Sequence, residues 1–197
     1  MKSLYRKVLA ISMFTLFAFF IASCGGNSAN NGTANPQKAG SATPGNIVPP
    51  SQGSQFPPLA APVANAELEM LDGTKIKASD RKGNVILLNL WATWCGPCRS
   101  EMPHLVEMQD KYRDKGFQVL GLDIGDGNGK PETVEEIKKF AANMKLNYEL
   151  FRISNETVGE YYRVTKFEGV PQTLLVDREG RLRGVFLGGG SKVINSM

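Results

Sequence analysis

The hydrophobic pattern of residues 58–197 changes repeatedly between strand-like and helix-like segments. Short segments rich in apolar residues and bounded by polar or glycine-rich residues predict strands. These segments are residues 84–91 and 117–123, which are expected to be buried, and the short strand 148–153. Apolar residues at helical spacing, with helix-start and helix-stop residues at their ends, predict helices. These segments are residues 95–115, 131–144 and 156–162.

Two further pairs of short strand-like segments flank turn residues, and each pair predicts an antiparallel hairpin. The N-terminal pair is 66–71 and 74–78, and the C-terminal pair is 173–176 and 182–187. Strands and helices alternate along the chain before the final hairpin. This order predicts an α/β fold with a mixed central sheet, helices on both faces and an N-terminal β-hairpin.

The first 57 residues differ in composition from the rest of the chain. A positively charged start precedes fifteen mostly apolar residues, 8–22, which is typical of a signal peptide and short for a membrane span. A retained transmembrane anchor is the alternative. Residues 25–57 are rich in Gly, Ser, Asn, Ala and Pro and cannot build a core, so they predict a flexible linker. The predicted organisation is a signal peptide at 1–23, a linker at 24–57 and one folded domain at 58–197.

Net charge gives no indication of a nucleic-acid partner. The whole chain carries a net charge of +4, and its pI is about 9.0. Three of the positive charges and none of the negative ones lie in residues 1–23, so residues 24–197 carry only +1. The basic pI therefore reflects the targeting segment in part, and we expect no binding to nucleic acid.

The strongest chemical signal is a pair of cysteines, Cys95 and Cys98, that follows the predicted strand 84–91. A cysteine at a helix N-terminus faces unpaired backbone N–H groups and the positive end of the helix dipole, which favour the thiolate. The spacing places the two Cα atoms about 5 Å apart, within the range of a disulfide. Pro97 suits the first helical turn, where its missing N–H would have no partner. We therefore predict that Cys95 attacks a disulfide partner and that Cys98 resolves the mixed disulfide.

Other roles for these residues agree less well with the sequence. A structural zinc site needs four ligands, and apart from carboxylates the chain adds only His104 and Cys24 to the pair. A permanent disulfide across so short a loop would constrain the unfolded chain little. The glycine-rich segment 125–129 lacks the ligand spacing of an EF-hand and the ending of a P-loop. We expect no metal and no cofactor, and we expect His104 to be a surface or partly buried residue.

Two motifs carry a resemblance to a known family. The sequence Trp-Cys-Gly-Pro-Cys at 94–98 resembles the active site of thioredoxins. The longer string 89–103 is similar to the TlpA/ResA-like thiol–disulfide oxidoreductases of the AhpC/TSA–Redoxin-like superfamily. Residues 168–177 resemble the cis-proline loop of that family and the strand after it. The resemblance covers about residues 60–190, and it implies a thioredoxin fold and thiol–disulfide exchange, usually in the reducing direction.

The resemblance also assigns residues to a substrate-binding site. It implies that the rim of this site is formed by Trp94, Gly96, Pro97, Val170 and Pro171. The Val170–Pro171 bond is expected to be cis, and the Val170 backbone could then pair with an extended substrate segment. A trans-proline at a strand start is the alternative.

The resemblance gives Glu101 a role beside the cysteines. Asn89 stands where many thioredoxins carry a buried aspartate that handles the proton of the second cysteine, and an amide cannot do this. Glu101 matches the acid that ResA-like proteins place near their cysteines, and it lies one helical turn after Cys98. We hypothesise that Glu101 takes over this catalytic proton handling. The alternative is an ordinary surface glutamate.

The residues before Cys24 are small and resemble a bacterial lipobox, which implies cleavage before Cys24 and attachment of lipid to it. The protein is then expected to be lipid-anchored at the cell membrane on its extracytoplasmic, periplasmic side. Known roles in the family include keeping the thiols of apocytochrome c reduced, with electrons from a membrane protein of the CcdA/DsbD type. The expected partners are therefore disulfide-containing protein clients, such a donor, and the membrane. The family's C-terminal helix should be short or missing here, because only seven residues follow Gly190.

Rival functions differ in their sequence requirements. A thioredoxin-fold peroxidase typically has a Pro-x-x-x-Thr-x-x-Cys pattern, which this chain lacks. A copper-binding assembly factor needs a Cys-x-x-x-Cys and a distant histidine, and neither the spacing nor His104 fits. A module that only holds its client through the dithiol would not turn over. An oxidising disulfide donor of the DsbA kind has a similar dithiol and is distinguished by its reduction potential.

Overall fold

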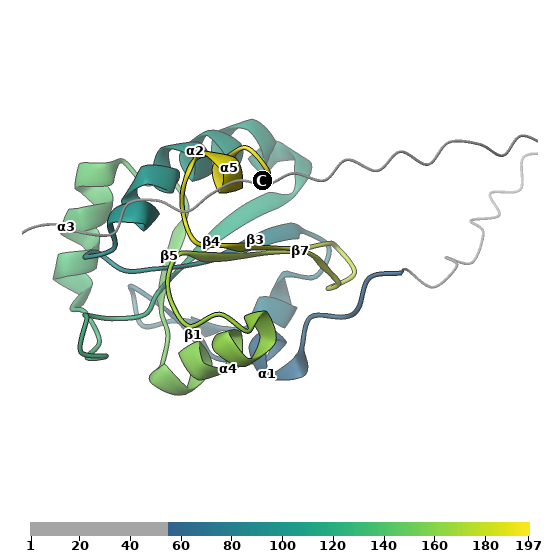
Figure 1. The fold of residues 1–197 in the computed structure, drawn as a ribbon, viewed down its shortest axis with the longest axis horizontal. Coiled ribbons are helices and arrows are strands. Elements are labelled where there is room, and N and C mark those ends of the chain that lie inside the picture. The colour runs from purple at the N-terminus through teal and green to yellow at the C-terminus, as the bar shows by residue number, and fades with distance from the viewer. Residues whose placement is uncertain (1–54) are drawn as a thin grey trace, which may run out of the picture. The chain divides into compact units, whose positions relative to one another are not determined.

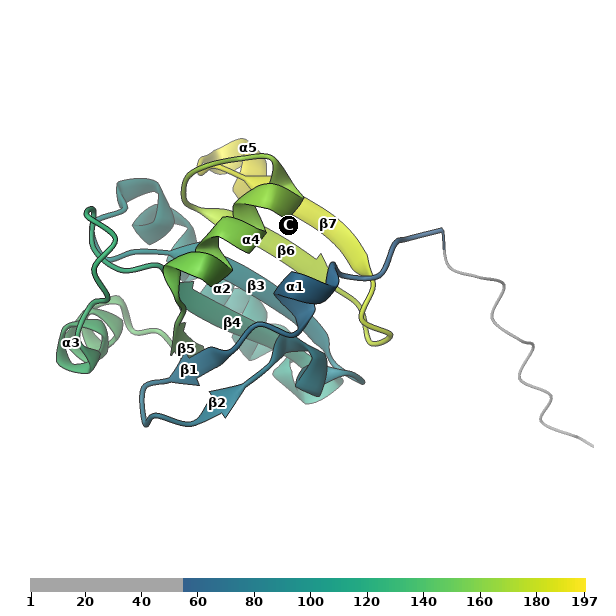
Figure 2. The same cartoon turned by 90° about the horizontal axis from the view of Figure 1, so that it is seen from below.

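A mixed seven-stranded sheet organises residues 55–197, the part of the chain that the computed structural model describes. The strand order is β2-β1-β5-β4-β3-β6-β7 (Figure 2). The strands are β1 (Leu68–Met70), β2 (Lys75–Ile76), β3 (Val85–Trp91), β4 (Phe117–Asp123), β5 (Glu149–Arg152), β6 (Gln172–Val176) and β7 (Leu182–Leu187). The helices are α1 (Ala61–Ala64), α2 (Gly96–Tyr112), α3 (Val134–Met144), α4 (Asn155–Thr165) and α5 (Ser191–Ile194), with short 3₁₀ helices η1 (Ala78–Arg81) and η2 (Arg113–Lys115).

The central strands β3, β4 and β5 are parallel, and the strands outside them are antiparallel to their neighbours. Parallel neighbours need crossover connections, which α2 and α3 supply. In this register Asn89 of β3 lies opposite Gly121 of β4 and Thr173 of β6. Three residues that are far apart in the sequence therefore meet at the middle of the sheet.

The short strands β1 and β2 lie at one edge of the sheet. They pair antiparallel, with Leu68 opposite Ile76, and β1 also pairs antiparallel with β5. At the turn between them, Gly73 has a φ of 88°, and the Asp72 Oδ1 accepts a hydrogen bond from the Thr74 N–H at 2.8 Å. The turn residues thus satisfy the backbone locally, as asparagine and aspartate do in such turns.

Helices cover both faces of the sheet, with α2 and α3 on one face and α1 and α4 on the other (Figure 1). Successive strand residues point to opposite faces, so β3 contributes to two cores. Leu88 and Leu90 belong to the apolar cluster that includes residues of α1 and α4. Trp91 belongs to the cluster that includes residues of α2 and α3, and Cys95 and Cys98 are part of that cluster.

The predicted helix start at Pro131 is wrong, because α3 begins at Val134. Thr133 is its N-cap: the Thr133 Oγ1 accepts a hydrogen bond from the Glu136 N–H at 3.2 Å, and the Glu136 Oε2 accepts one from the Thr133 N–H at 2.8 Å. This reciprocal pair is a capping box, which fixes the first turn of the helix. Glu132 therefore lies in the connection before the helix.

The other predicted elements are confirmed with small shifts in their ends. α2 ends at Tyr112, η2 continues to Lys115, and Gly116 with a φ of 74° closes the segment. α4 extends to Thr165, three residues beyond its predicted end, and stops at Lys166 in the left-handed conformation. The expectation of a short last helix is confirmed, since α5 has four residues.

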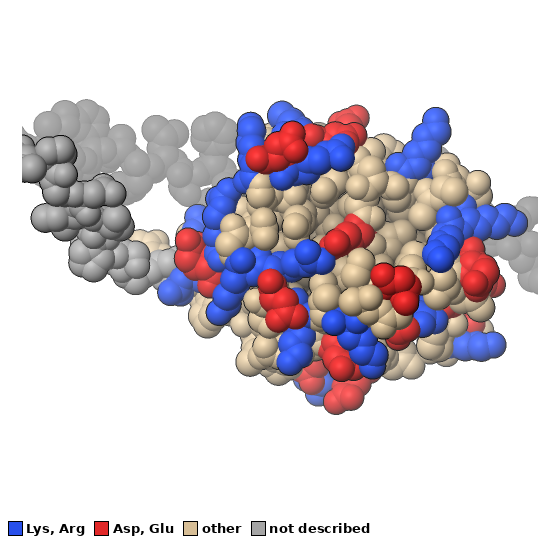
Figure 3. All heavy atoms as spheres, turned by 180° about the vertical axis from the view of Figure 1, so that it is seen from behind, with Lys and Arg blue, Asp and Glu red and all other residues tan. Residues whose placement is uncertain are grey.

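The signal peptide, Cys24 and most of the linker lie outside the described residues, so these predictions stand as predictions. Within residues 55–197, no helix has both the length and the apolar character needed to cross a membrane. On the face seen in Figure 3, lysine and arginine side chains are interspersed with aspartate and glutamate.

Candidate active site

The two cysteines form a disulfide at the N-terminus of α2, with their Cα atoms 5.3 Å apart. Cys95 is the N-cap of the helix, and its sulfur accepts a hydrogen bond from the Cys98 N–H at 3.1 Å. Both residues are buried, Cys95 with 3% of its surface exposed and Cys98 with none. A backbone N–H aimed at the Cys95 sulfur would stabilise negative charge there once the disulfide is reduced.

The rim beside Cys95 combines exposed and anchored residues. Half of the Trp94 surface is exposed, and its indole Nε1 donates to the Gly125 carbonyl at 3.0 Å. Pro97 is exposed and Gly96 is half-buried on the other side of the cysteine. An aromatic side chain with one fixed end offers a client both apolar surface and a defined orientation.

The cis-proline loop lies against the cysteine motif, as the sequence predicts. The Val170–Pro171 bond is cis, Pro171 is buried, and Val170 packs against the apolar cluster that contains both cysteines. The Pro171 carbonyl accepts a hydrogen bond from the Gly188 N–H at 2.9 Å. At the next residue, a Cβ added to Gly189 would lie 2.6 Å from the Pro97 Cβ. The segment after β7 therefore bridges the cis-proline and the cysteine loop.

Glu101 is completely buried, so the surface interpretation of this residue is wrong. Its Oε1 accepts a hydrogen bond from the Asn89 Nδ2 at 2.7 Å, and the same Nδ2 donates to the Thr173 Oγ1 at 2.9 Å. Among the described residues, the Glu101 Oε2 has no hydrogen-bond partner. Burial raises the pKa of Glu101 to about 7, although the Asn89 contact lowers it. The carboxyl can therefore gain or lose a proton near neutral pH, one helical turn from Cys98.

His104 is partly buried, which agrees with the sequence-based expectation. Its Nε2 is shielded from solvent and has no hydrogen-bond partner among the described residues. Within residues 55–197, no group of three or more histidine, cysteine, aspartate or glutamate side chains is arranged to hold a metal ion.

Sequence reasoning missed three buried polar groups. Asp123 is 1% exposed at the end of β4, and Glu132 is 6% exposed before α3. The Tyr148 hydroxyl is buried, and burial together with the charge of Glu101 raises the pKa of Tyr148. An aspartate that directly follows a buried apolar run was a usable signal, and the Thr133–Glu136 capping box would have placed Glu132 outside the helix.

Comparison with known proteins gives this arrangement a family. Residues 59–185 match the model of the AhpC/TSA family, which covers more than half of the chain. The chain belongs to the AhpC/TSA family. Among curated proteins, it is similar to the thiol-disulfide oxidoreductase ResA of Bacillus thuringiensis subsp. konkukian (33% identity over 112 residues, 57% of this chain and 60% of the relative). It is also similar to the thioredoxin-like protein YneN of Bacillus subtilis (31% identity over 121 residues, 61% of this chain and 66% of the relative).

Solved structures establish the fold of this AhpC/TSA family member. A candidate thiol:disulfide interchange protein DsbE from Chlorobium tepidum has 27% identity and a TM-score of 0.57, over 73% of this chain and 92% of that one. The thioredoxin domain of a thiol-disulfide oxidoreductase from Bacteroides vulgatus has 27% identity and a TM-score of 0.56, over 68% and 91%. The fold is the thioredoxin fold. The chain spans about 60% of the length of the ResA proteins that it matches.

Proposed function

We propose that this protein is a membrane-anchored, extracytoplasmic thiol–disulfide oxidoreductase that reduces protein disulfides through Cys95 and Cys98. The observation that carries the proposal is the disulfide at the start of α2, with the Cys98 N–H directed at the Cys95 sulfur. The names of the curated relatives and of the structural neighbours support the same reaction class.

The reaction runs in two exchange steps in which atoms and electrons balance. The Cys95 thiolate attacks one sulfur of the client disulfide, a mixed disulfide forms, and the other client sulfur leaves as a thiolate. The Cys98 thiolate then attacks the Cys95 sulfur and releases the second client sulfur. The client gains two electrons and becomes a dithiol, while the protein returns to the Cys95–Cys98 disulfide. A separate electron donor must reduce this disulfide before the next turnover.

The second step requires that Cys98 lose its proton inside the protein, because Cys98 is fully buried. In our proposal Glu101 accepts this proton. Its position one turn along α2, its unpartnered Oε2 and its pKa of about 7 support that role. Asn89 orients the carboxyl by donating to the Glu101 Oε1.

Client binding in this proposal uses the surface around the cysteines. The exposed Trp94 and Pro97 provide apolar contact, and the Val170 backbone beside the cis-proline pairs with an extended client segment. Strand addition suits a broad range of unfolded clients, since main-chain hydrogen bonds do not depend on sequence. Apocytochrome c is one client class of this kind, and a membrane protein of the CcdA/DsbD type would be the donor.

The deciding experiment measures the reduction potential of the full chain, purified in detergent and equilibrated with thiol buffers. A value of about −250 mV or lower fits a reductase, whereas a value near −120 mV fits an oxidant of the DsbA kind and would contradict the proposed direction. Insulin reduction with a supplied thiol reductant should require Cys95. Consumption of peroxide without a disulfide client would instead favour a peroxidase.

The membrane anchor is tested separately. In a bacterial host, wild-type protein should incorporate labelled fatty acid and sediment with membranes, and a Cys24→Ala variant should not incorporate the label. Wild-type protein without label in the membrane fraction would contradict the lipid anchor and leave the retained apolar segment as the alternative.

A further inference from the structure

Two buried carboxylates lie beside the active-site loop without a role in the proposed exchange reaction. Asp123 ends β4 and Glu132 precedes α3, and both are more than nine-tenths buried. Charged side chains are almost never buried to this degree unless they are paired. Among the described residues, the Asp123 Oδ1 and the Glu132 Oε2 have no hydrogen-bond partner. The fold therefore buries two carboxyl groups whose desolvation is unfavourable, both beside the active-site loop.

Each of these carboxylates is connected to Trp94 through one intervening residue. The Glu132 Oε1 accepts a hydrogen bond from the Thr93 hydroxyl at 2.6 Å. The Asp123 Oδ2 accepts one from the Gly125 N–H at 3.2 Å, and the Gly125 carbonyl in turn accepts from the Trp94 indole at 3.0 Å. One carboxylate thus holds the side chain of the residue before the tryptophan, and the other holds the glycine whose carbonyl binds the indole ring.

We propose that Asp123 and Glu132 are positioning residues that together hold Trp94 in place beside the cysteine loop for client docking. The inference rests on the proposed oxidoreductase function, because it assigns Trp94 to client binding. Ionisation of Asp123 beside Glu132 would weaken this hold and the docking of polypeptide clients.

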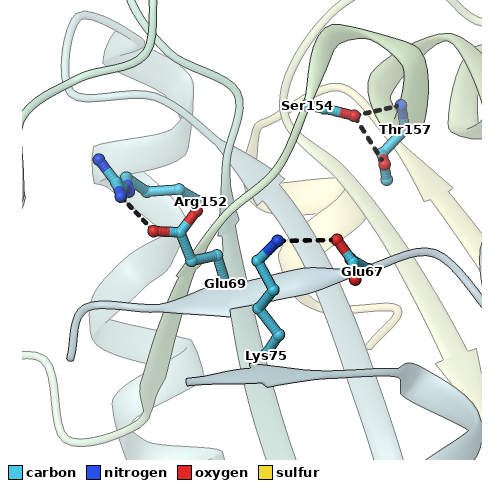
Figure 4. Close-up of polar contacts among 6 residues, drawn as sticks. All are labelled: Glu67, Glu69, Lys75, Arg152, Ser154 and Thr157. Carbon is cyan, nitrogen blue, oxygen red and sulfur yellow. Dashed lines mark hydrogen bonds and ion pairs between the residues drawn. The ribbon is translucent and has the colours of Figure 1, made fainter. Parts of the chain in front are cut away.

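The charges around Asp123 explain why its ionisation is unfavourable. Arg152 of β5 is the cation that acts on Asp123, and it is also ion-paired with Glu69 of β1 (Figure 4). One arginine therefore faces the pair while it is already engaged by another carboxylate. Burial and the neighbouring Glu132 raise the pKa of Asp123 to about 7, although Gly125 and Arg152 lower it. At neutral pH Asp123 is therefore close to its ionisation.

The surroundings also show how repulsion between the two carboxylates could be relieved. Thr93, Trp94 and Glu132 line a groove of about 820 Å³ that opens beside α3. The other charged side chains of this groove are Asp126, Lys130, Glu136 and Lys139. From the side of α2, the Arg99 Nη1 donates to the Thr93 carbonyl at 3.2 Å. A Glu132 carboxylate repelled by Asp123 would turn into the groove and release the Thr93 hydroxyl.

The first test measures acrylamide quenching of tryptophan fluorescence in the oxidised full chain between pH 5 and pH 9. Trp91 is fully buried, so quenching reports mainly on Trp94. Wild-type protein should show a rise in quenching through a transition near pH 7, the pKa to which Asp123 is raised. Asp123→Asn keeps an oxygen for the Gly125 N–H and removes the charge, and it should lose the transition.

Controls separate this pair from other titrating groups. Asp126→Asn changes a partly exposed carboxyl of the same loop and should retain the transition. If Asp123→Asn does not fold, Glu132→Gln provides the same test, because its amide oxygen can still accept from Thr93. A transition that persists in both variants, or that disappears in Glu101→Gln, would overturn the proposal.

The second test separates docking from chemistry. In wild-type protein, KM for a polypeptide disulfide should rise above pH 7, while kcat on a small-molecule disulfide should not follow that change. Asp123→Asn should flatten the KM profile, and a steep unchanged profile would contradict the proposal. The quenching experiment needs no turnover, so it is independent of the proposed function. If Trp94 shows a transition that depends on Asp123 but the protein has no Cys95-dependent reductase activity, the proposed function has failed and the positioning pair stands.

Discussion

At the scale of single residues, the active site has an amide, not a carboxyl, on the strand that precedes the cysteines. Asn89 occupies the middle of β3 and donates to both Glu101 and Thr173. The acid is carried by α2 instead, one turn beyond Cys98. A buried carboxyl with a single hydrogen-bond donor has a pKa raised toward neutral pH, because desolvation outweighs the one contact.

The first prediction concerns the pH dependence of stability at Glu101. Its pKa is raised from 4.5 in the unfolded chain to about 7 in the folded protein, so the folded state retains the proton longer. Its contribution to stability is present below pH 4.5 and is lost as pH rises to about 7, by about 3 kcal/mol at about 1.4 kcal/mol per pKa unit. Glu101→Gln should remove this part of the slope in urea unfolding at pH 4.5 and pH 8. An unchanged slope would contradict the burial argument.

The second prediction concerns the division of labour between the cysteines. In reduced protein, Cys95 should react with iodoacetamide at least about tenfold faster than Cys98. A larger thiolate fraction and better access both favour Cys95. Cys98→Ala should accumulate a mixed disulfide with a client, whereas Cys95→Ala should not. Mass spectrometry of the trapped species identifies the cysteine involved, and a trap through Cys98 would reverse the assignment.

At the scale of elements, caps and close approaches determine where the site residues lie. The Thr133–Glu136 capping box starts α3 late, and this leaves Glu132 free to reach Thr93. After β7, Gly189 passes so close to Pro97 that a side chain at this position would clash. The first feature connects the start of α3 to the cysteine loop, and the second connects the end of β7 to it.

The third prediction tests the contact after β7. Gly189→Ala would place a Cβ 2.6 Å from the Pro97 Cβ, so the cysteine loop or the segment 188–190 must shift. We expect a loss of about 1–3 kcal/mol in unfolding free energy and a lower rate of insulin reduction. Gly127→Ala is the matched control, since no atom lies within 4 Å of its added Cβ. Equal behaviour of the two variants in thermal unfolding and turnover would refute the close approach.

At the scale of the whole molecule, the sheet separates redox chemistry from a second core. The cysteines belong to the cluster that includes α2 and α3, whereas Tyr161 belongs to the cluster that includes α1 and α4. Changes in the second cluster should therefore alter stability without altering the reaction. Tyr161 is suited to this test, because it is fully buried and its hydroxyl has no partner among the described residues.

The fourth prediction is that Tyr161→Phe stabilises the protein. Removal of an unpartnered buried hydroxyl relieves its desolvation cost, and we expect a gain of about 1 kcal/mol in unfolding free energy. The rate of insulin reduction should equal that of wild-type protein. A loss of stability would mean that the hydroxyl is hydrogen-bonded in solution, and a loss of activity would mean that the two cores are coupled.

The sequence by itself determined the order of strands and helices, the cysteine pair at a helix start and the proline motif that precedes β6. These features are local, because a run of apolar residues or a Cys-x-x-Cys acts over a few neighbours. The sequence left Glu101 undecided between a surface and a catalytic position, and its signals for Asp123 and Glu132 were too weak to show that either residue is buried.

Only the tertiary structure decided where these residues lie and what they contact, because their partners are remote in the chain. Asn89 contacts Glu101 across 12 residues and Thr173 across 84, and Thr93 contacts Glu132 across 39. Burial of a carboxyl depends on the register of β3 with β4 and β6 and on the packing of α2 over them. Since desolvation sets the charge of such groups, their chemistry is fixed only when the sheet has assembled.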